Sequence, residues 1–249
     1  MISNNRIQRL HDKLGLLISA SKPGARLPSE PELARQLGIS RATLREAMRT
    51  FETQGIISRR QGIGTFVMRP AHVIETGLEV LESIDTLAKR IGLEVCMGAA
   101  KIAVRKPQPE EAEILGLQPG AQVTDVSRAI IAEQRPVAYL IDIVPTHLLP
   151  PEDLGTDFKG SVLDLLLRRN NLALVNSYCE INAVGATAEL ARALDIQRGA
   201  PLLRFIARLY AVDGTVVDYS FSYFLPGYFR FHVVRALGRP SDFYPGSAT

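Results

Sequence analysis

The sequence predicts an α+β protein with an N-terminal winged helix-turn-helix and a larger C-terminal domain built on an antiparallel sheet. Two short amphipathic helical segments flank Gly38, and two β-prone runs flank Gly62-x-Gly64. After residue 92 the sequence contains runs rich in Val, Ile, Tyr and Phe, which are typical of β-strands. With 249 residues, the chain is long enough for two domains of ordinary size.

A first helix is predicted over residues 5–20. Its apolar residues recur at helical spacing and end before Pro23-Gly24, at Ile7, Leu10, Leu14, Leu17 and Ile18.

The next two helices form the helix-turn-helix. Ser29 followed by Glu32 is a capping box, and Gly38 permits the sharp reversal between the helices. Ser40 then caps a second helix, whose apolar residues follow the pattern i, i+3, i+4, i+7 at Leu44, Ala47, Met48 and Phe51.

The second helix has the features of a recognition helix. Arg41 lies in its N-terminal turn, the part that reaches base edges in the major groove, and Arg45 and Arg49 point away from the apolar stripe. The hairpin wing over 56–67 brings further basic and polar residues toward phosphates or the minor groove. The candidate DNA-binding residues are Ser29, Ser40, Arg41, Thr43, Arg45, Arg49, Arg59, Arg60, Gln61 and Gly62.

Some of these residues also have a structural interpretation. Ser29 and Ser40 serve as helix caps whether or not their hydroxyls touch phosphate, and Thr43 fits an ordinary helix surface equally well. The acidic Glu46 is expected to pair with a neighbouring arginine rather than to contact DNA.

Charge is unevenly distributed along the chain. Residues 1–69 carry a balance of +7 and the remainder a balance of −4, which together give the net +3. A small basic domain joined to a mildly acidic larger one suits a nucleic-acid reader with a sensor attached.

Composition argues against several other classes of protein. The isolated Cys96 and Cys179 suggest neither a disulfide framework nor a zinc site, and the four histidines form no ligand spacing with them. We therefore expect no metal and no cofactor. The sequence has no run long enough to span a membrane and no secretion signal, so a cytoplasmic location with no membrane partner is expected.

The rest of the chain is read as follows. Residues 71–77 are expected to form a linker and 78–91 a helix. Strands are predicted over 95–104, 123–132, 137–144, 174–184, 202–211 and 216–224, with helices over 109–115, 161–169 and 187–194. Asp213-Gly214 is a strong turn signal, so the last two strands should form a hairpin.

Over residues 3–68 the sequence closely resembles the GntR family of bacterial transcription regulators. The residues that carry the resemblance stand in the family's order: Leu27-Pro28-Ser29-Glu30, Ser40-Arg41, Leu44-Arg45-Glu46-Ala47, Gly55 and Gly62-x-Gly64-Thr65-Phe66-Val67. One departure is Pro31, which stands where relatives often have a basic residue that contacts DNA.

The tail, over about 90–240, resembles the UTRA effector domain of the HutC-type branch, whose fold is like that of chorismate lyase. Its landmarks are Leu115-Gly116-Leu117-x-x-Gly120, Ser127-Arg128, Arg135-Pro136-Val137-Ala138, Leu194, Pro201-Leu202-Leu203 and Asp218-Tyr219-Ser220. The strand-rich, histidine-poor tail differs from the all-helical, metal-binding effector domains of another GntR branch.

The resemblance implies an effector pocket over the sheet, with Arg128 contacting an anionic group. Ser161, Asp218 and Tyr223 are the other expected contacts. Arg128 also fits a surface ion pair, Ser161 a simple N-cap, and Asp218 and Tyr223 ordinary residues of the sheet surface. Relatives that sense sugar phosphates carry a second basic residue and an acid where this chain has Ile130 and Leu140. A small carboxylate or a partly apolar metabolite is therefore expected instead.

The sequence predicts a DNA-binding regulator, most simply a repressor, that is a homodimer on a two-fold symmetric operator and is controlled by a small-molecule effector. The alternatives are a constitutive DNA-binding protein with a vestigial sensor, or a lyase-like enzyme, for which no catalytic spacing is found. The expected boundaries are 1–69 for the reader, 70–91 for a linker and connecting helix, 92–240 for the effector domain and 241–249 for a tail.

Overall fold

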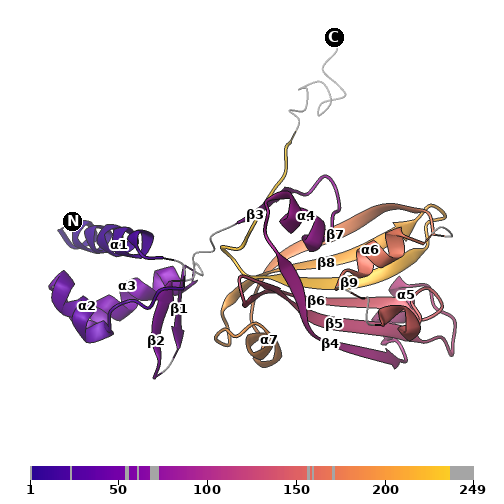
Figure 1. Ribbon diagram of the computed structural model, residues 1–249, viewed down its shortest axis with the longest axis horizontal. Helices are drawn as coiled ribbons and strands as arrows, with labels where there is room; N and C mark the ends of the chain where they lie inside the picture. Colours follow the sequence, from indigo (N-terminus) through magenta and orange to yellow (C-terminus); the bar gives the residue numbers. More distant parts are fainter. Residues whose placement is uncertain are drawn as a thin grey trace, which may run out of the picture.

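The structure is a computed structural model that describes residues 2–22, 24–53, 56–60, 62–67, 73–155, 158, 160–169 and 172–235. Side chains are described from residue 10 onward within these ranges, except those of Thr53 and Arg60. An N-terminal module and a larger C-terminal module lie along the longest axis of the molecule (Figure 1).

Three helices build the N-terminal module: α1 (Ile2–Ala20), α2 (Glu30–Leu37) and α3 (Arg41–Thr53). Their apolar faces meet in one core that includes the fully buried Leu14, Leu33, Leu44 and Met48. The three predicted helices are confirmed, because the 3.6-residue periodicity gave each a face to bury.

The turn between α2 and α3 has the predicted chemistry. Gly38 adopts φ 65°, a left-handed conformation that costs other residues energy, and ends α2. At the start of α2 the amide nitrogen and hydroxyl of Ser29 donate to the Glu32 carboxylate at 2.9 and 2.7 Å. Ser40 caps α3 by accepting from the amide of Thr43 at 3.1 Å.

The wing is an antiparallel pair, β1 (Ile57–Arg60) and β2 (Gly64–Val67). Gly64 has φ 143°, a conformation that other residues rarely adopt, and a Cβ there would lie 2.6 Å from Nε of Arg26, so the Arg26 side chain would have to move. The predicted winged helix-turn-helix is therefore confirmed.

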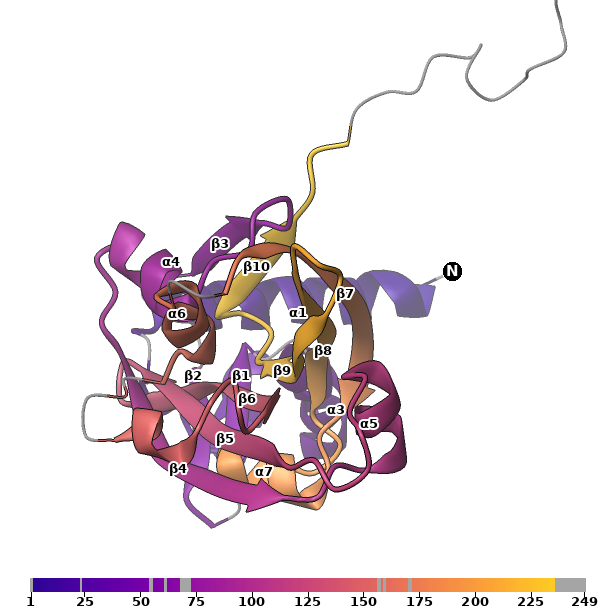
Figure 2. The same ribbon diagram turned by 90° about the vertical axis from the view of Figure 1, so that its right-hand side faces the viewer.

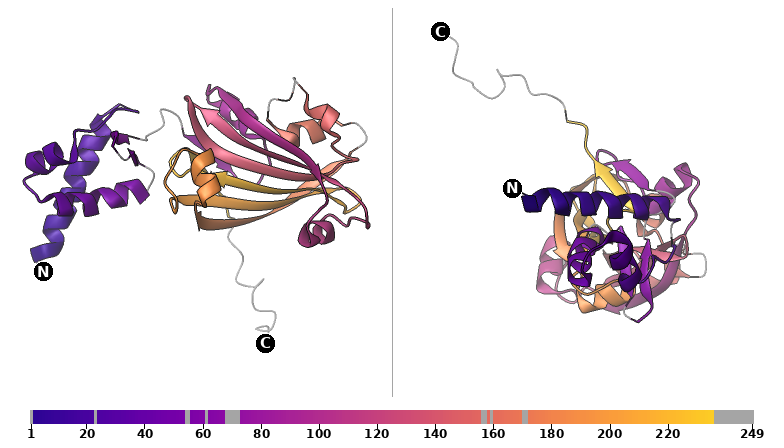
Figure 3. Two further views of the ribbon diagram at one scale, coloured as in Figure 1. Left: turned by 90° about the horizontal axis from the view of Figure 1, so that it is seen from below. Right: turned by 90° about the vertical axis from the view of Figure 1, so that its left-hand side faces the viewer.

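The C-terminal module is a six-stranded antiparallel sheet, ordered β4-β5-β6-β9-β8-β7, that curves strongly (Figure 3). Its strands are β4 (Val95–Arg105), β5 (Val123–Ala132), β6 (Arg135–Pro145), β7 (Leu174–Gly185), β8 (Pro201–Ala211) and β9 (Val216–Phe224). All six predicted strands and the β8–β9 hairpin are confirmed.

Short helices cover both faces of this sheet (Figures 1 and 2). On one face lie α5 (Pro109–Ile114) and α7 (Ala188–Ala193). On the other lie α4 (Ile84–Arg90) and α6 (Val162–Leu167), with the 3-10 turn η1 (Pro151–Leu154) nearby. The three predicted helices of this module, which correspond to α5, α6 and α7, are confirmed.

The region after the wing differs from the prediction. Residues 74–77 form a strand, β3 (Ile74–Gly77), which pairs in parallel with the last strand, β10 (Phe229–His232). The helix predicted over 78–91 covers only α4, because the hydroxyl of Ser83 accepts from the amide of Thr86 and starts the helix there. The predicted tail, 241–249, lies outside the described residues.

Candidate functional site

The N-terminal turn of α3 is open to solvent. Arg41 is exposed directly after the capping Ser40, whose hydroxyl lies 2.8 Å from that of Thr43. Serine and threonine hydroxyls and an arginine therefore lie together at the end of the helix from which major-groove readers contact bases.

Two further arginines of α3 make ion pairs but stay accessible. Arg45 donates from Nε to Glu30 at 2.7 Å, and its side chain is 57% exposed. Arg49 lies 3.8 Å from Glu46 and is 76% exposed, so the expected role of Glu46 as an ion-pair partner is confirmed. Exposed pairs of this kind are worth about 0–1 kcal/mol, so either arginine can exchange its partner for a phosphate or a base.

Arg59 is more enclosed than expected. Its guanidinium lies 3.7 Å from Glu30 on α2 and 4.0 Å from Glu52 on α3, and its side chain is 28% exposed. It therefore joins the wing to both helices rather than standing free above DNA. The exposed Gly62 marks the wing tip, whereas Gln61 and the side chain of Arg60 lie outside the described residues.

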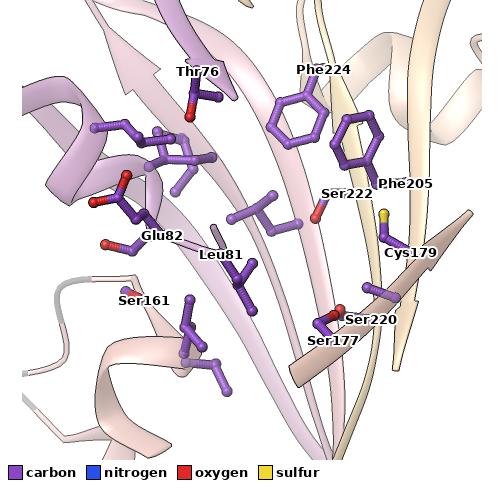
Figure 4. Close-up of a pocket in the computed structure, with 18 of the residues that line it drawn as sticks. Thr76, Leu81, Glu82, Ser161, Ser177, Cys179, Phe205, Ser220, Ser222 and Phe224 are labelled. Carbon is purple, nitrogen blue, oxygen red and sulfur yellow. The ribbon is translucent and has the colours of Figure 1, made fainter. Parts of the chain in front are cut away.

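A cavity of about 450 Å³ opens over one face of the large sheet. Its walls come from the sheet, from β3 and β10, from the 78–85 segment and from the start of α6 (Figure 4). This volume is within the usual range for small-molecule sites. Its position over the sheet agrees with the pocket that the resemblance implied.

Arg128 forms part of the cavity floor, but it is 2% exposed and already has partners. Its Nε donates to the carbonyl oxygen of Gly160 at 2.7 Å, its Nη1 donates to that of Val126 at 3.1 Å, and Nη1 is ion-paired with Asp142. The surface ion pair weighed for Arg128 from the sequence is thus a buried one. The positive charge of Arg128, which was expected to bind an anionic ligand, is therefore neutralised by Asp142.

Ser161 and Asp218 also line the cavity. The hydroxyl of Ser161 accepts from the amide of Asp164 at 3.0 Å, so this residue is an N-cap that faces the cavity. Burial, and secondly the adjacent Asp142, raise the pKa of Asp218 well above the usual range of aspartates; Arg128 opposes this shift more weakly.

Tyr223 is not part of this cavity. Successive residues of a strand face opposite sides, and the cavity is lined by Asp218, Ser220, Ser222 and Phe224 of β9. Tyr223 therefore faces the side that α7 covers. Asp142, by contrast, was not among the predicted site residues. It lies on β6 two residues after Leu140 and four after Ala138, so alternation along the strand places it on the same face of the sheet as Leu140, which also lines the cavity.

A winged helix-turn-helix with exposed arginines, joined to a sheet domain with a ligand-sized cavity, defines a DNA-binding transcription regulator with an effector domain. The gntR family of bacterial regulatory proteins matches residues 8–67, and the UTRA domain matches residues 92–230. This chain belongs to the GntR family, in the HutC-type branch with a UTRA effector domain.

Named relatives are similar over most of their length. The transcriptional repressor NagR of Bacillus subtilis is 31% identical over 80% of this chain and 81% of its own. MngR of Escherichia coli, named as the repressor of mannosyl-D-glycerate transport and metabolism, is 28% identical over 86% and 88%. The crystal structure of PhnF from Mycobacterium smegmatis has the same fold, with a TM-score of 0.63 and 22% identity over 92% and 99% of the two chains.

These matches agree with the prediction that the chain is a regulator rather than an enzyme, because the family and the relatives are named as transcription regulators. Among the described residues, no group of three histidine, cysteine or acidic side chains is placed to hold a metal ion. No helix in the described part of the chain is both long and apolar enough to cross a membrane.

Proposed function

We propose that this protein is a cytoplasmic, metabolite-controlled repressor that binds a two-fold symmetric operator as a homodimer. The observation that carries this proposal is the pairing, in one chain, of a solvent-facing α3 terminus bearing Arg41 with a cavity of about 450 Å³. The direction of regulation is supported by relatives named as repressors, including NagR and MngR.

DNA contacts are assigned by exposure and position. Arg41 and Arg45 read base edges from the first turns of α3, with Thr43 beside them, while Arg49 contacts phosphate. The hydroxyls of the capping residues Ser29 and Ser40 donate to phosphate in the complex, and for Ser29 this means that its hydroxyl exchanges the Glu32 carboxylate for a phosphate oxygen. Arg60, Gln61 and Gly62 contact phosphate from the wing. Arg59 contributes by holding the wing against α2 and α3.

The cavity supports an effector-controlled protein over a constitutive one with a vestigial sensor. An unfilled cavity of this size lowers the stability of a domain, and larger side chains would remove that cost. A domain that had lost its ligand would therefore be expected to lose the cavity as well. Relatives named for mannosyl-D-glycerate metabolism and for histidine utilization regulate genes of small-molecule metabolism. Control by a metabolite is therefore the function that suits this domain best.

The homodimer is assigned to the β7 edge of the sheet. Val175, Tyr178 and Ile181 on this strand are 59%, 54% and 44% exposed, and β7 has a sheet neighbour on one side only. An exposed apolar edge strand is a hazard that proteins usually cover, here by the second copy. A dimer also supplies the paired reading heads that a two-fold operator needs.

Effector binding can reach the reader through β3. This strand lines the cavity with Thr76 and Gly77 and is the first described element of the effector module after the wing. A ligand that shifts β3 therefore changes the relative position of the two winged helix-turn-helix modules of the dimer. A coupling of about 1–3 kcal/mol is sufficient for regulation, and it is reciprocal between DNA and ligand.

Selection of bound sequences from random DNA tests the proposal. We expect an inverted repeat, protected by two protein chains per site, and release of that DNA by a metabolite that also raises the melting temperature. In light scattering, Val175→Arg should shift the dimer toward monomer, whereas the matched change Ile102→Arg on the opposite edge strand, β4, should not. One protein chain bound per site would contradict the dimeric assignment.

A further inference from the structure

An unsatisfied carboxyl oxygen lies in the effector cavity. Asp218 on β9 is 5% exposed, and its Oδ1 has no hydrogen-bond partner among the described residues. Because side chains alternate along a strand, Asp218 faces the same side as Ser220 and Ser222, which point into the cavity in Figure 4. A buried acceptor without a donor costs free energy, so a ligand that donates to it is favoured.

Most of the acidic and basic side chains around this oxygen are acidic. On the floor, Asp142 of β6 carries the charge that balances Arg128 of β5. Glu82 and Asp85 also line the cavity and are ion-paired with Arg90 and Lys89. The carboxyl and basic side chains that line the cavity are therefore four carboxyl groups and one guanidinium.

The rest of the cavity is apolar and aromatic. Phe205 and Phe224 line it with ring centroids 5.0 Å apart, and Phe231 lies 4.6 Å from Phe205. Ile130 and Leu140 lie near them on the sheet. Aromatic faces attract cations as well as apolar groups.

We propose that the effector carries a protonated amine on an apolar, ring-sized body, and that the amine donates to Oδ1 of Asp218. This inference rests on the proposed function only in taking the cavity as the effector site. The apolar body packs against Phe205 and Phe224, and the amine lies at the acidic end of the cavity, near Asp218 and Asp142.

An anionic ligand fits these observations poorly. It would place a negative charge beside the Asp142 carboxylate, and like charges at close range raise each other's energy. Arg128 offers little compensation, because its Nε and Nη1 already donate to Gly160, Val126 and Asp142. The small carboxylate expected from the sequence therefore loses its main support.

Binding of an amine has a measurable consequence for protons. Burial and Asp142 raise the pKa of Asp218, so its carboxyl favours the protonated form more than an exposed aspartate does. A protonated amine favours the ionised carboxylate, so its binding lowers the raised pKa of Asp218. We therefore expect proton release to the buffer on binding, and the complex gains a buried ion pair. A neutral alcohol of the same shape leaves the proton in place.

Three probes of similar shape separate these cases: 2-phenylethylamine, 2-phenylethanol and 3-phenylpropionate. Calorimetry on the full chain at pH 7, in PIPES and in BES, gives both affinity and proton release, since the two buffers differ in ionisation enthalpy. We expect the amine to bind about ten-fold more tightly than the propionate, a difference of about 1.4 kcal/mol. Only the amine should release a proton.

The variant Asp218→Asn keeps the shape of the side chain but cannot ionise. It should lose the preference for the amine and the proton release, while phenylethanol binds as before. The matched control Glu94→Gln changes an exposed carboxylate outside the cavity and should leave all three probes unaffected. Circular dichroism checks that both variants fold.

Equal or tighter binding of the propionate, amine binding that survives Asp218→Asn with its proton release, or no amine binding at about 10 mM would each overturn the inference. Binding of unliganded wild-type chain to the selected operator is measured in parallel. Its loss would contradict the proposed function, whereas intact operator binding with the wrong probe order contradicts only the ligand class.

Discussion

Gln197, in the turn after α7, donates from Nε2 to the carbonyl oxygen of Arg59 on wing strand β1 at 3.1 Å. Arg59 is also the residue whose side chain lies between Glu30 of α2 and Glu52 of α3. The effector module therefore touches the reader at the residue that joins its wing to its helices. This contact offers a second route, besides β3, by which the two modules sense each other.

Substitution of Gln197 by Ala should loosen the wing without unfolding either module. Removing one exposed hydrogen bond costs about 0.5–1.5 kcal/mol at most. We expect faster amide hydrogen exchange in the 57–60 peptide and a smaller effect of effector on operator affinity. The exposed Gln118, in a turn of the effector module, provides the control Gln118→Ala; equal exchange in both variants would argue against a role for the contact.

Arg41→Ala should weaken binding to the preferred operator by about 1–3 kcal/mol and relax base choice at one position of each half-site, because the guanidinium is lost from a base edge. A gel-shift titration against the operator and its single-base variants measures both effects. Arg168→Ala removes an exposed arginine from the end of α6 and should leave binding unchanged. Unchanged operator affinity in Arg41→Ala would show that another element reads the bases.

Arg49 and Arg59 should respond differently to removal. Arg49→Ala deletes a 76%-exposed charge, so binding to all sequences should weaken and the salt slope should fall by about one. Arg59→Ala breaks the link between the wing and two helices, so the melting temperature of the reader should fall while the salt slope changes less. A salt titration of DNA binding with a parallel thermal melt separates a phosphate contact from a structural role. If both variants lowered the salt slope equally, Arg59 would also be a phosphate contact.

Arg128→Ala should destabilise the effector module before it changes any ligand response. Removing one partner of a buried ion pair leaves Asp142 uncompensated, at a cost of about 3–5 kcal/mol. The double variant Arg128→Met/Asp142→Leu removes both charges and should recover most of this loss. Urea denaturation measures the series, and equal stability of Arg128→Ala and wild type would mean that the pair is open to water.

The stability of the wild type relative to Asp218→Asn should fall as pH rises. An acid with a pKa raised by folding binds its proton more tightly in the folded state. That stability is fully present below the unfolded pKa, about 3.9, and is lost as pH rises through the folded pKa. The difference in unfolding free energy between the two proteins, measured at pH 5 and pH 8, should therefore favour the wild type more at pH 5.

Local patterns were sufficient to predict most of the elements. The periodicity around Leu44, the glycine at 38 and the β-branched residues of β5 each predicted the segment that formed. The first creates a face to bury, the second permits a tight turn, and the third favours a strand. By contrast, β3 depends on a partner about 155 residues later in the chain, as in the pairing of Ile74 with Phe229. No local pattern contains that information.

Only some residues of the cavity could be predicted from the sequence, because the others depend on contacts between strands that are distant in the chain. The resemblance to the UTRA domain, with the N-cap position of Ser161, indicated Arg128, Ser161 and Asp218, and all three line the cavity. The pairing of Arg128 with Asp142 across neighbouring strands depends on the register of β5 against β6, which fixes the local charge and therefore the kind of ligand. Tyr223, expected as an effector contact from the resemblance, lies an odd number of residues after Asp218 on β9 and so faces the other side of the sheet from the cavity.

The pairing of β3 with β10 also fixes when the sensor becomes functional during synthesis. Domains at the N-terminus fold first as a chain leaves the ribosome, and the reader is complete by Val67. The cavity, however, is walled by Phe229 and Phe231, so it cannot close until almost the whole chain has been made. A nascent or prematurely terminated chain would therefore have the winged helix without a closed pocket. Its DNA binding would not be regulated by the effector.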